Sequence, residues 1–419
     1  MKRVVITGCG CILPCGDDVN SAFESVLNCN SWIKKNEKFD VSTYKSKVCA
    51  GLYLNDEIYN KYNFLADTKD RRRLDDVEYI ALIASYNAMV DSGLIDNQII
   101  NKDRFGTFVS SGIGGIKTIQ DTTKVLIEKG NRRISPFFLT ASLINMCAGN
   151  ISLKFGFNGP SIAHVSACAT STHAIGEAFN YIREGKLDGC LAGGAEMAVC
   201  ELGIGGFDAM NALSSKFNDT PELSSRALDK DRDGFVMGEG SVVLMLEELE
   251  HAKKRNAKIY CEIAGYGASC DAYHITSPDI EGKGASKAMQ NAITDAKIDI
   301  TDVDYINLHG TSTPAGDAAE ISAIRKTFGT NATNVAISST KSITGHLLGA
   351  TGALEAMFCA KSLEQQILIP SANIQNLDEK FADLNIVMEK KPSKINYALS
   401  NSFGFGGTNG TLLFKKYED

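Results

Sequence analysis

The sequence lacks the features that mark several classes of protein. No window approaches ~18 uninterrupted apolar residues, which excludes a membrane-spanning helix. The twelve cysteines form no C-x-x-C motif, and a chain of 419 residues does not depend on disulfides, so we expect free buried thiols in a reducing compartment. Basic residues are not in excess either. A count of 43 Lys and Arg against 50 Asp and Glu gives a net charge of −7, which argues against nucleic-acid binding across the whole surface.

Neither export nor a flexible linker is expected. The opening MKRVVITGCG imitates a leader peptide, but its apolar stretch is short, interrupted by glycine, and soon followed by Asp17 and Asp18. Within it, VVIT has the composition of a buried strand. We therefore expect a cytoplasmic protein. Because the chain also has no low-complexity segment, its parts are expected to pack as one unit.

The sequence does contain a regular alternation of apolar runs and helical patterns. Runs such as GCLAGGAE at 189–196 and SVVLMLEE at 241–248 are typical of buried strands. Helical segments are expected at 77–93, where Gly93 is a plausible C-cap, and at 284–298. Strands that alternate with helices indicate parallel sheets covered by helices, and hence an α/β protein.

One short pattern occurs twice. Cys168 and His346 are each followed nine residues later by a glutamate, Glu177 and Glu355, within segments of mostly small residues. A β-rich run precedes each, which predicts the same strand, turn and helix made twice. KIYCEIAGYG also resembles the opening KRVVITGCG. We expect two related halves, residues 1–257 and 258–419, that bring the cysteine and the histidine to equivalent helix starts facing each other.

Cys168 is a candidate nucleophile, with two histidines as candidate partners. The start of the helix that follows Cys168 would stabilise a thiolate; the alternative is a small buried side chain like other cysteines. His309 ends an apolar strand, where α/β proteins place ligands. His346 lies at a helix start, where the dipole keeps an imidazole neutral. Either could be structural, but together, in the half opposite Cys168, they favour a site.

Metal and phosphate sites are not favoured by the motifs. Zinc at Cys168, His309 and His346 is disfavoured because no two of these residues are closely spaced in the sequence. DKDRDGFVMGEG opens like a calcium loop, but its last position is Gly240 instead of an acidic residue. NSFGFGGTNG, residues 401–410, lacks the Lys-Ser/Thr of a P-loop and precedes a strand. It indicates a strained loop that brings N–H groups near a ligand, with Phe403 as either a gate or a core aromatic.

A family resemblance spans essentially the whole chain. It rests on seven segments in order: VSACAT, GGAE, DKDRDGFVMGEG, DAYHITSP, NLHGTSTPAGD, SSTKSITGHLLGATGALEA and NSFGFGGTNG. Together they resemble the β-ketoacyl-acyl-carrier-protein synthases, elongating condensing enzymes of the thiolase superfamily, and the type II enzyme in particular. The resemblance implies a thiolase-like α/β fold, in which two related βαβαβαββ halves form a layered α-β-α-β-α sandwich. It also implies an acyltransferase of fatty-acid elongation, which condenses malonyl-acyl-carrier protein with an enzyme-bound acyl thioester and releases carbon dioxide.

The resemblance implies roles for single residues. Cys168 would hold the acyl chain as a thioester, and His309 and His346 would stabilise the enolate that forms when carbon dioxide leaves. The backbone N–H groups of Cys168 and Phe403 would form an oxyanion hole. Further implied residues are Lys341, Glu355, Asp317 and Glu320 for ordering the site around His346; Thr311 and Thr313 for the phosphopantetheine arm, with Thr276 and Ser277 nearer the tunnel mouth; and Ile113, Phe207 and Phe138 for the acyl tunnel, the last across a homodimer interface.

The partner is implied to be the acidic acyl carrier protein. Basic candidates for its docking are Lys69, Arg71, Arg72, Arg73, Arg132 and Arg133, for which a merely solvated basic stretch is the alternative. No resident cofactor is expected, because phosphopantetheine arrives on the carrier. A structural monovalent cation near Asn307 and Glu355 is compatible with the resemblance.

Neighbouring families sharpen the expected chemistry. Thiolases carry a second cysteine in the glycine-rich loop, which this chain lacks, and the initiating synthases use Cys-His-Asn where this chain has His346. Non-catalytic chain-length partners have lost the cysteine. The Cys-His-His set therefore favours decarboxylative elongation. The alternative is a catalytically weak acyl-binding partner of another condensing enzyme, including one of polyketide type.

Overall fold

Strands from both parts of the chain form one hydrogen-bonded series. The computed structural model describes residues 1–95 and 100–418, and within them nine strands pair in the order β4-β5-β6-β1-β7-β13-β12-β8-β9. The first group is β1 Val4–Ile12, β4 Phe105–Ser110, β5 Gly189–Glu196 and β6 Gly240–Glu248. The second is β7 Cys261–Cys270, β8 Tyr305–Asn307, β9 Ala336–Ser338, β12 Tyr397–Gly404 and β13 Thr408–Lys415. A short antiparallel pairing of β1 with β7 joins the two groups.

The two groups repeat one strand order. From the junction outwards, the second group runs β7, β13, β12, β8 and β9. The first runs β1, β6, β5 and β4, and a parallel bridge from Thr107 to Ser161 supplies the fifth position. In both groups the first two pairings are antiparallel and the next two are parallel. The predicted duplication is therefore confirmed in the topology, with the chain at Ser161 in the place of β9.

The sheet is mixed, which differs from the parallel sheets predicted by the alternation of strands and helices. β13 follows β12 through a short turn that contains η9, Phe405–Gly407. Strands joined by so short a connection pair antiparallel, because a parallel pair needs a crossover of a dozen or more residues. β6 occupies the corresponding antiparallel position beside β5. Among the described strands, the parallel expectation holds for the β4–β5, β8–β12 and β8–β9 pairs, as it does for the bridge from Thr107 to Ser161.

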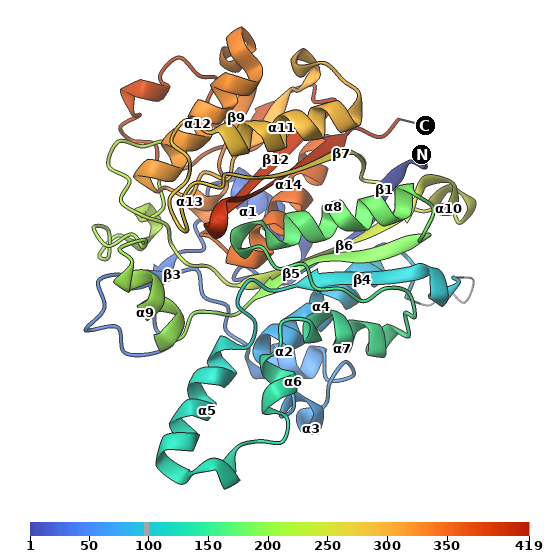
Figure 1. Ribbon diagram of the computed structural model, residues 1–419, viewed down its shortest axis with the longest axis vertical. Helices are drawn as coiled ribbons and strands as arrows, with labels where there is room; N and C mark the ends of the chain where they lie inside the picture. Colours follow the sequence, from blue (N-terminus) through green and yellow to red (C-terminus); the bar gives the residue numbers. More distant parts are fainter. Residues whose placement is uncertain (96–99, 419) are drawn as a thin grey trace.

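Helices form three layers around the strands. α8 (Thr170–Arg183) and α14 (Thr351–Gln365) lie in the middle and contact strands of both groups. α4 (Asp76–Asp91) and α7 (Met146–Phe155) cover the first group, and α11 (Lys283–Ala296) and α12 (Pro314–Phe328) cover the second. Figure 1 shows these layers in order, from α11 and α12 at the top to α4 and α7 below. This is the α-β-α-β-α arrangement that the resemblance predicted.

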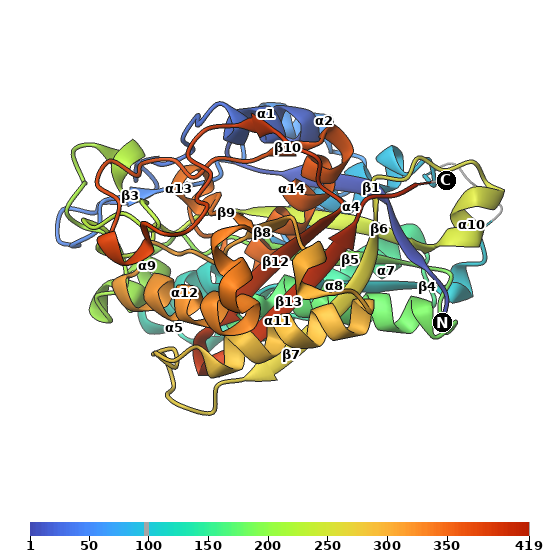
Figure 2. The ribbon, with the colours of Figure 1, turned by 90° about the horizontal axis from the view of Figure 1, so that it is seen from above.

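The remaining elements are short or peripheral. Both chain ends lie at the same end of the molecule as α10 (Figures 1 and 2). The predicted division at residues 257 and 258 falls between α10 and β7. No helix of the described residues is long and apolar enough to cross a membrane. The peripheral elements are α1 Val19–Leu27, β2 Lys34–Lys35, β3 Val48–Cys49, α2 Asp56–Lys61, α3 Thr68–Arg71, α5 Ile116–Lys129, α6 Phe138–Ser142, α9 Glu201–Ala209, α10 Leu249–Lys254, β10 Ile367–Leu368 and β11 Lys391–Pro392.

The ends of α4 follow from its local sequence. The side chain of Asp75 accepts a hydrogen bond from the backbone N–H of Val77 and so caps the first turn. At the other end the helix stops at Asp91, and Gly93 adopts a left-handed φ of 69° just beyond the cap residue Ser92. Gly93 therefore ends this helix as predicted, because glycine takes that conformation without steric cost.

The two central helices approach each other closely at a glycine. A Cβ on Gly352 of α14 would lie 2.0 Å from Oγ1 of Thr172 in α8 and 2.9 Å from its backbone nitrogen. We expect Gly352→Ala to lower the free energy of unfolding by ~1–3 kcal/mol, because the helices would have to separate. Denaturant titration measures this. Gly206→Ala in α9 is the matched control, since a Cβ there meets nothing within 4 Å. Equal stability of the two variants would contradict the close approach.

Candidate active site

A cavity of about 390 Å³ lies beside the starts of the central helices. It is lined by residues of both halves, including ten that the sequence singled out: Cys168, Phe207, Thr276, Ser277, His309, Thr311, Thr313, Glu320, His346 and Phe403. Ile113 and Phe138 do not line it. Ile113 belongs to the same apolar cluster as Phe207, and Phe138 begins α6 with its side chain half-buried.

Cys168 and His346 hold corresponding places in the two halves. Cys168 lies in η3 (Ala167–Ala169), after the Ser161 bridge and directly before α8. His346 lies after β9, between α13 (Lys341–Thr344) and η7 (Leu348–Ala350), and η7 leads into α14. Each residue thus links the fifth strand position of its half to a central helix. The predicted equivalence of the two helix starts is present in the fold.

The structure brings Cys168, His309 and His346 together. The sulfur and one ring nitrogen from each histidine lie within 4.8 Å of one another. The two imidazole rings are 5.3 Å apart, centroid to centroid, and almost perpendicular at 84°. Their separation in the sequence argued against a shared metal ion. Residues far apart in the sequence can still lie close together in the folded chain, so this argument does not exclude one. The expectation that the site works without a metal stays a prediction.

Both histidines are held neutral. Burial and the nearby positive charge of Lys341 place the pKa of His309 and of His346 well below the ordinary histidine value. Nδ1 of His346 is 2.9 Å from Oγ1 of Thr351, the first residue of α14. Nε2 of His346 and Nδ1 of His309 have no hydrogen-bond partner among the described residues. Neutral imidazoles with free nitrogens are suited to exchange hydrogen bonds or a proton with a bound molecule.

The thiol of Cys168 is protonated at rest. Burial raises its pKa to about 12, and the charge of Lys341 opposes this shift. The stabilisation predicted from the start of α8 therefore competes with desolvation, which also costs a thiolate free energy. A neutral imidazole within 4.8 Å is a suitable acceptor for the thiol proton.

The backbone N–H groups directed at the Cys168 sulfur belong to Cys168 itself and to Phe405, which corrects the prediction for Phe403. The backbone of Phe405 donates a hydrogen bond that lowers the pKa of the thiol. Phe403 is still within β12, paired with Asn409 of β13, and its ring packs 5.8 Å from the His309 ring. Phe403 and Phe405 lie two residues apart in NSFGFGGTNG, and they differ in that β12 ends between them, at Gly404.

Lys341 and Glu355 form a buried ion pair beside the histidines. Lys341 begins α13, Glu355 lies in α14, and Nζ and Oε1 are in contact. Burial raises the pKa of Glu355 to about 7, against the opposing charge of Lys341. The placement agrees with the predicted role of this pair in ordering the region of His346, because a buried charge without a partner is costly.

Glu320 and Asp317 serve the His309 side of the site, not the His346 side as predicted. Glu320 accepts hydrogen bonds from the backbone N–H groups of His309 at 2.8 Å and Gly310 at 2.7 Å. Asp317 accepts from the N–H groups of Ser312 at 3.1 Å and Leu228 at 2.9 Å. Both carboxylates lie in α12, which follows the His309 segment directly, so they reach back to its backbone.

The four residues predicted to bind the arm through their hydroxyl groups all line the cavity. The Oγ1 atoms of Thr311 and Thr313 are 3.1 Å apart, and Thr313 also caps α12 by accepting from the N–H of Gly316. Thr276 and Ser277 lie on a separate loop, where their N–H groups donate to Nδ1 of His274. The cavity is thus lined by hydroxyl groups from two separate segments of the chain as well as by the reactive cluster.

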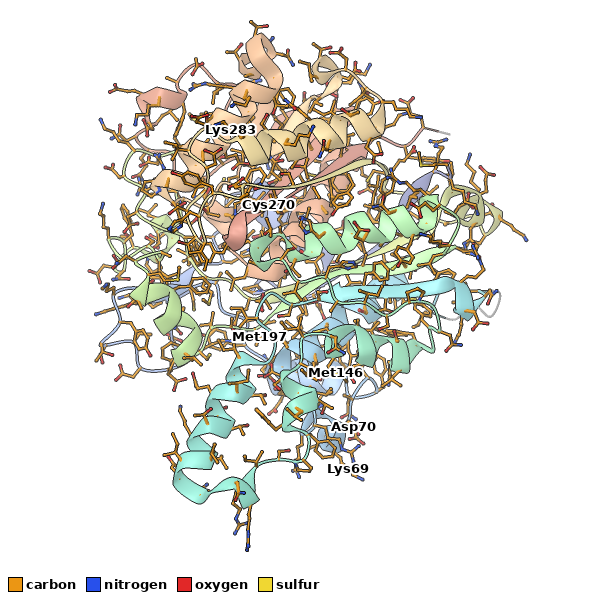
Figure 3. All side chains as sticks on the ribbon, in the orientation of Figure 1. Lys69, Asp70, Met146, Met197, Cys270 and Lys283 are labelled. Atoms are coloured by element: carbon orange, nitrogen blue, oxygen red, sulfur yellow. The ribbon has the colours of Figure 1, made fainter. Side chains whose placement is uncertain are left out.

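None of the six predicted docking residues lines the cavity formed by the described part of the chain. Figure 3 places Lys69 at the opposite end of the molecule from Lys283, and Cys270, which precedes the cavity residue Asp271, between them. The guanidinium of Arg71 lies 4.4 Å from the Tyr59 ring, and Arg73 pairs with Asp70. Arg72 is exposed, and so are Arg132 and Arg133 in η2, Asn131–Arg133. Their role in docking stays a prediction.

Comparison with known proteins gives full-length relatives. The chain is 46% identical over all 419 residues to a 3-oxoacyl-[acyl-carrier-protein] synthase 2 of Coxiella burnetii, and covers 99% of that protein. A protein of the same name from Vibrio cholerae is 45% identical, with 99% of each chain covered.

Solved structures and family models agree with these relatives. A β-ketoacyl synthase from Burkholderia phymatum superimposes with a TM-score of 0.90 at 33% identity, with both chains fully covered. A ketosynthase of a type II polyketide system, in complex with its acyl-carrier protein, gives a TM-score of 0.90 at 30% identity, also with both chains fully covered. Residues 1–252 match the β-ketoacyl synthase N-terminal domain and residues 260–375 the C-terminal domain. The chain belongs to the β-ketoacyl synthase family.

Proposed function

We propose that this β-ketoacyl synthase elongates fatty acyl chains by decarboxylative condensation of malonyl-acyl-carrier protein with an acyl group held on Cys168. The observation that carries the proposal is the cluster of one thiol and two neutral imidazoles, with reactive atoms within 4.8 Å, in a cavity lined by hydroxyl groups. This arrangement supplies a nucleophile and two hydrogen-bond donors in one desolvated place.

The first step is acyl transfer. The Cys168 sulfur attacks the thioester carbonyl of the acyl carrier, so that a new S–C bond forms and the bond to the pantetheine sulfur breaks. The thiol proton passes through a neutral imidazole to the departing pantetheine thiol. The N–H groups of Cys168 and Phe405 meet at the sulfur and are suited to hold the carbonyl oxygen as it gains charge.

The second step removes carbon dioxide from the malonyl carrier. The bond to the carboxylate breaks, carbon dioxide leaves, and the electron pair is held as an enolate on the thioester oxygen. The free nitrogens of His309 and His346 stabilise that oxygen by hydrogen bonds. Because both rings are neutral and already in place, they require little reorganisation as the charge develops.

The third step forms the carbon–carbon bond. The enolate carbon attacks the Cys168 thioester, the C–S bond breaks, and the sulfur recovers a proton. The products are a β-ketoacyl carrier, carbon dioxide and the free carrier released in the first step, so atoms and charge balance with one proton consumed. A thiol is suited to this sequence because it both accepts and releases the acyl group.

In the proposed complex, different residues contact the phosphopantetheine arm and the acyl chain. Thr311 and Thr313 would bind the phosphopantetheine arm, with Thr276 and Ser277 nearer the mouth. Phe207 and Ile113 belong to one apolar cluster, which would receive the acyl chain. The carrier itself would dock through Lys69, Arg71, Arg72, Arg73, Arg132 and Arg133, although these residues lie away from this cavity in a single chain.

The protein is proposed to act as a cytoplasmic homodimer. Large apolar side chains are exposed near Phe138: Phe137, Leu139 and Leu143, together with Leu153 of α7, which lines one cavity with Thr140 of α6. Exposed apolar groups gathered in one region indicate an interface. A second copy over this region would bring Phe138 of each chain towards its partner, in agreement with the predicted tunnel wall.

A structural monovalent cation fits beside the site. Asn307 and Ser400 are paired across β8 and β12, and the side-chain polar atoms of both are buried without hydrogen-bond partners among the described residues. Oε2 of Glu355 is also buried without a hydrogen-bond partner among the described residues. Orphaned buried oxygens of this kind require a partner, which an oxygen-binding cation would supply. Asn307, Ser400 and Glu355 would hold it, and it would support the fold of the site.

Mass spectrometry tests the nucleophile and the substrate together. Incubation with acyl carriers of graded chain length should add one acyl mass, located by peptide mapping on Cys168, with a yield that depends on chain length. The exposed Cys270 is an internal control that should stay unmodified. An acyl group on Cys270, or no adduct with any carrier, would contradict the proposal and favour a non-catalytic acyl-binding partner.

A further inference from the structure

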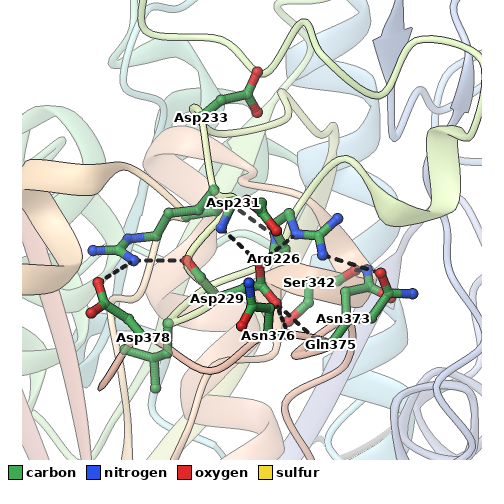
Figure 4. Close-up of polar contacts among 12 residues, drawn as sticks. Arg226, Asp229, Asp231, Asp233, Ser342, Asn373, Gln375, Asn376 and Asp378 are labelled. Atoms are coloured by element: carbon green, nitrogen blue, oxygen red, sulfur yellow. Dashed lines mark hydrogen bonds and ion pairs between the residues drawn. The ribbon is translucent and has the colours of Figure 1, made fainter. Parts of the chain in front are cut away.

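The acidic segment at 229–234 forms hydrogen bonds with other residues of this chain and so joins the two halves. Asp229 receives a hydrogen bond from Nε of Arg226 at 3.0 Å and from the backbone N–H groups of Gln375 and Asn376 at 2.8 and 2.7 Å. Figure 4 shows these contacts converging on Asp229. Its carboxylate is thus already committed to donors from this chain. The segment that resembled a calcium loop therefore fixes the first half against the second.

Ser312, between the two arm-binding threonines, is held by Gly234 of the same segment and by Arg226 just before it. Its hydroxyl accepts from the backbone N–H of Arg226 at 3.0 Å, and its carbonyl accepts from the N–H of Gly234 at 3.1 Å. Its own N–H donates to Asp317 at 3.1 Å. Every polar group of this buried serine is therefore engaged, two of them by the opposite half of the chain.

The backbone of Ser312 also adopts a strained conformation. Its φ of 69° lies in the left-handed region, which residues with a side chain rarely adopt. Such a conformation persists only where the surroundings enforce it. Asp317 also receives the N–H of Leu228 and lies 3.4 Å from Nε of Arg232, so that it ties Ser312 to the acidic segment from a second side.

We propose that Ser312 is a positioning residue for the pantetheine arm. Its clamped, left-handed backbone turns the flanking Thr311 and Thr313 so that their hydroxyls lie 3.1 Å apart on the cavity wall. The inference deepens the proposed function and rests on it. It assigns to a residue without access to the substrate the task of aligning the two hydroxyls that hold it.

The effect of Ser312 is expected on the arm and not on the reactive cluster. The backbone of His309 is anchored separately by Glu320, which also accepts from Nδ2 of Asn401. Cys168 lies in η3 of the other half. Loss of the Ser312 hydroxyl therefore leaves these groups in place, and only the orientation of the threonines changes.

The test compares two alkylating probes that both react with Cys168. Bromoacetyl-pantetheine carries the arm and iodoacetamide does not; in each, the sulfur displaces the halide and the proton passes to buffer. The wild type should react faster with the arm-bearing probe. Ser312→Ala and Ser312→Gly should each lower that preference about three- to tenfold, as expected for loss of a buried hydrogen bond, with the iodoacetamide rate unchanged.

The second variant and a control separate positioning from misfolding. Glycine tolerates the left-handed backbone, so Ser312→Gly removes the hydroxyl without retaining the strain of a side chain. Ser224→Ala removes another buried hydroxyl, one bonded to the carbonyl of Phe217, and should keep the wild-type preference. An unchanged preference in both Ser312 variants, or no preference in the wild type, would overturn the inference. Arm-dependent labelling without condensation by the wild type would overturn the proposed function alone.

Discussion

Cys168→Ala should abolish condensation but leave malonyl-carrier decarboxylation intact or faster. Condensation should fall by ~10⁴-fold or more, because the described residues that line the cavity include no second thiol to hold the acyl chain. Decarboxylation should persist because it depends on His309 and His346, whose free nitrogens do not rely on a bond to the sulfur. With the acyl group absent, the enolate would take up a proton and leave as an acetyl carrier.

Two product measurements check this separation. Mass spectrometry of the carrier distinguishes β-ketoacyl from acetyl products, and released carbon dioxide gives the decarboxylation rate. Cys270→Ala is the matched control, since this exposed cysteine lies beside the cavity but does not line it. Condensation at the wild-type rate by Cys168→Ala would refute the mechanism. Loss of both activities would show instead that the sulfur is needed for decarboxylation.

His309→Ala should slow decarboxylation by ~10²–10³-fold, the usual effect of removing one donor to a developing oxyanion. The acyl adduct on Cys168 should still form, because His346 keeps its position on Thr351 and the sulfur keeps the N–H of Phe405. The loss should be equal at pH 6 and pH 8. Burial and Lys341 hold the pKa of both imidazoles well below the ordinary histidine value, so both are expected to stay neutral at the two pH values.

A distant histidine provides the control for this variant. His251 in α10 contacts Glu247 and is remote from the cavity residues, so His251→Ala should decarboxylate normally. The anchor of Glu320 to the backbone of residues 309 and 310 remains in His309→Ala, so the loop should keep its shape. A decarboxylation rate within a few-fold of wild type would remove His309 from the proposed role.

The short pattern that occurs twice in the sequence made the two-fold repeat of the fold predictable. Cys168 and His346 have the same spacing to a glutamate, and that register corresponds to one strand order used twice. His309 has no counterpart in the repeated pattern; its place at the end of an apolar strand made it a candidate, and the family resemblance supplied its role. Local chain signals, such as Gly93 at the end of α4, were also reliable because they depend on backbone conformation near that residue.

What escaped prediction depends on how distant segments meet. Phe403 and Phe405 look alike in the sequence, and only the end of β12 decides which N–H is directed at Cys168. The direction in which Asp317 and Glu320 reach depends on the packing of α12 against its own preceding loop. The structural role of the acidic residues at 229–234 could not be predicted from their own sequence, because the N–H groups that Asp229 binds come from residues near 375.

The buried charge of Lys341 links the two stages of the reaction. It favours the charged form of Cys168 and disfavours the charged forms of His309 and His346, so the free energies of these three proton equilibria depend on one another. Once Cys168 carries an acyl group it can no longer hold negative charge. The field of Lys341 then acts on the next anion to form, the enolate. One buried charge thus stabilises both the thiolate of the first step and the enolate of the second.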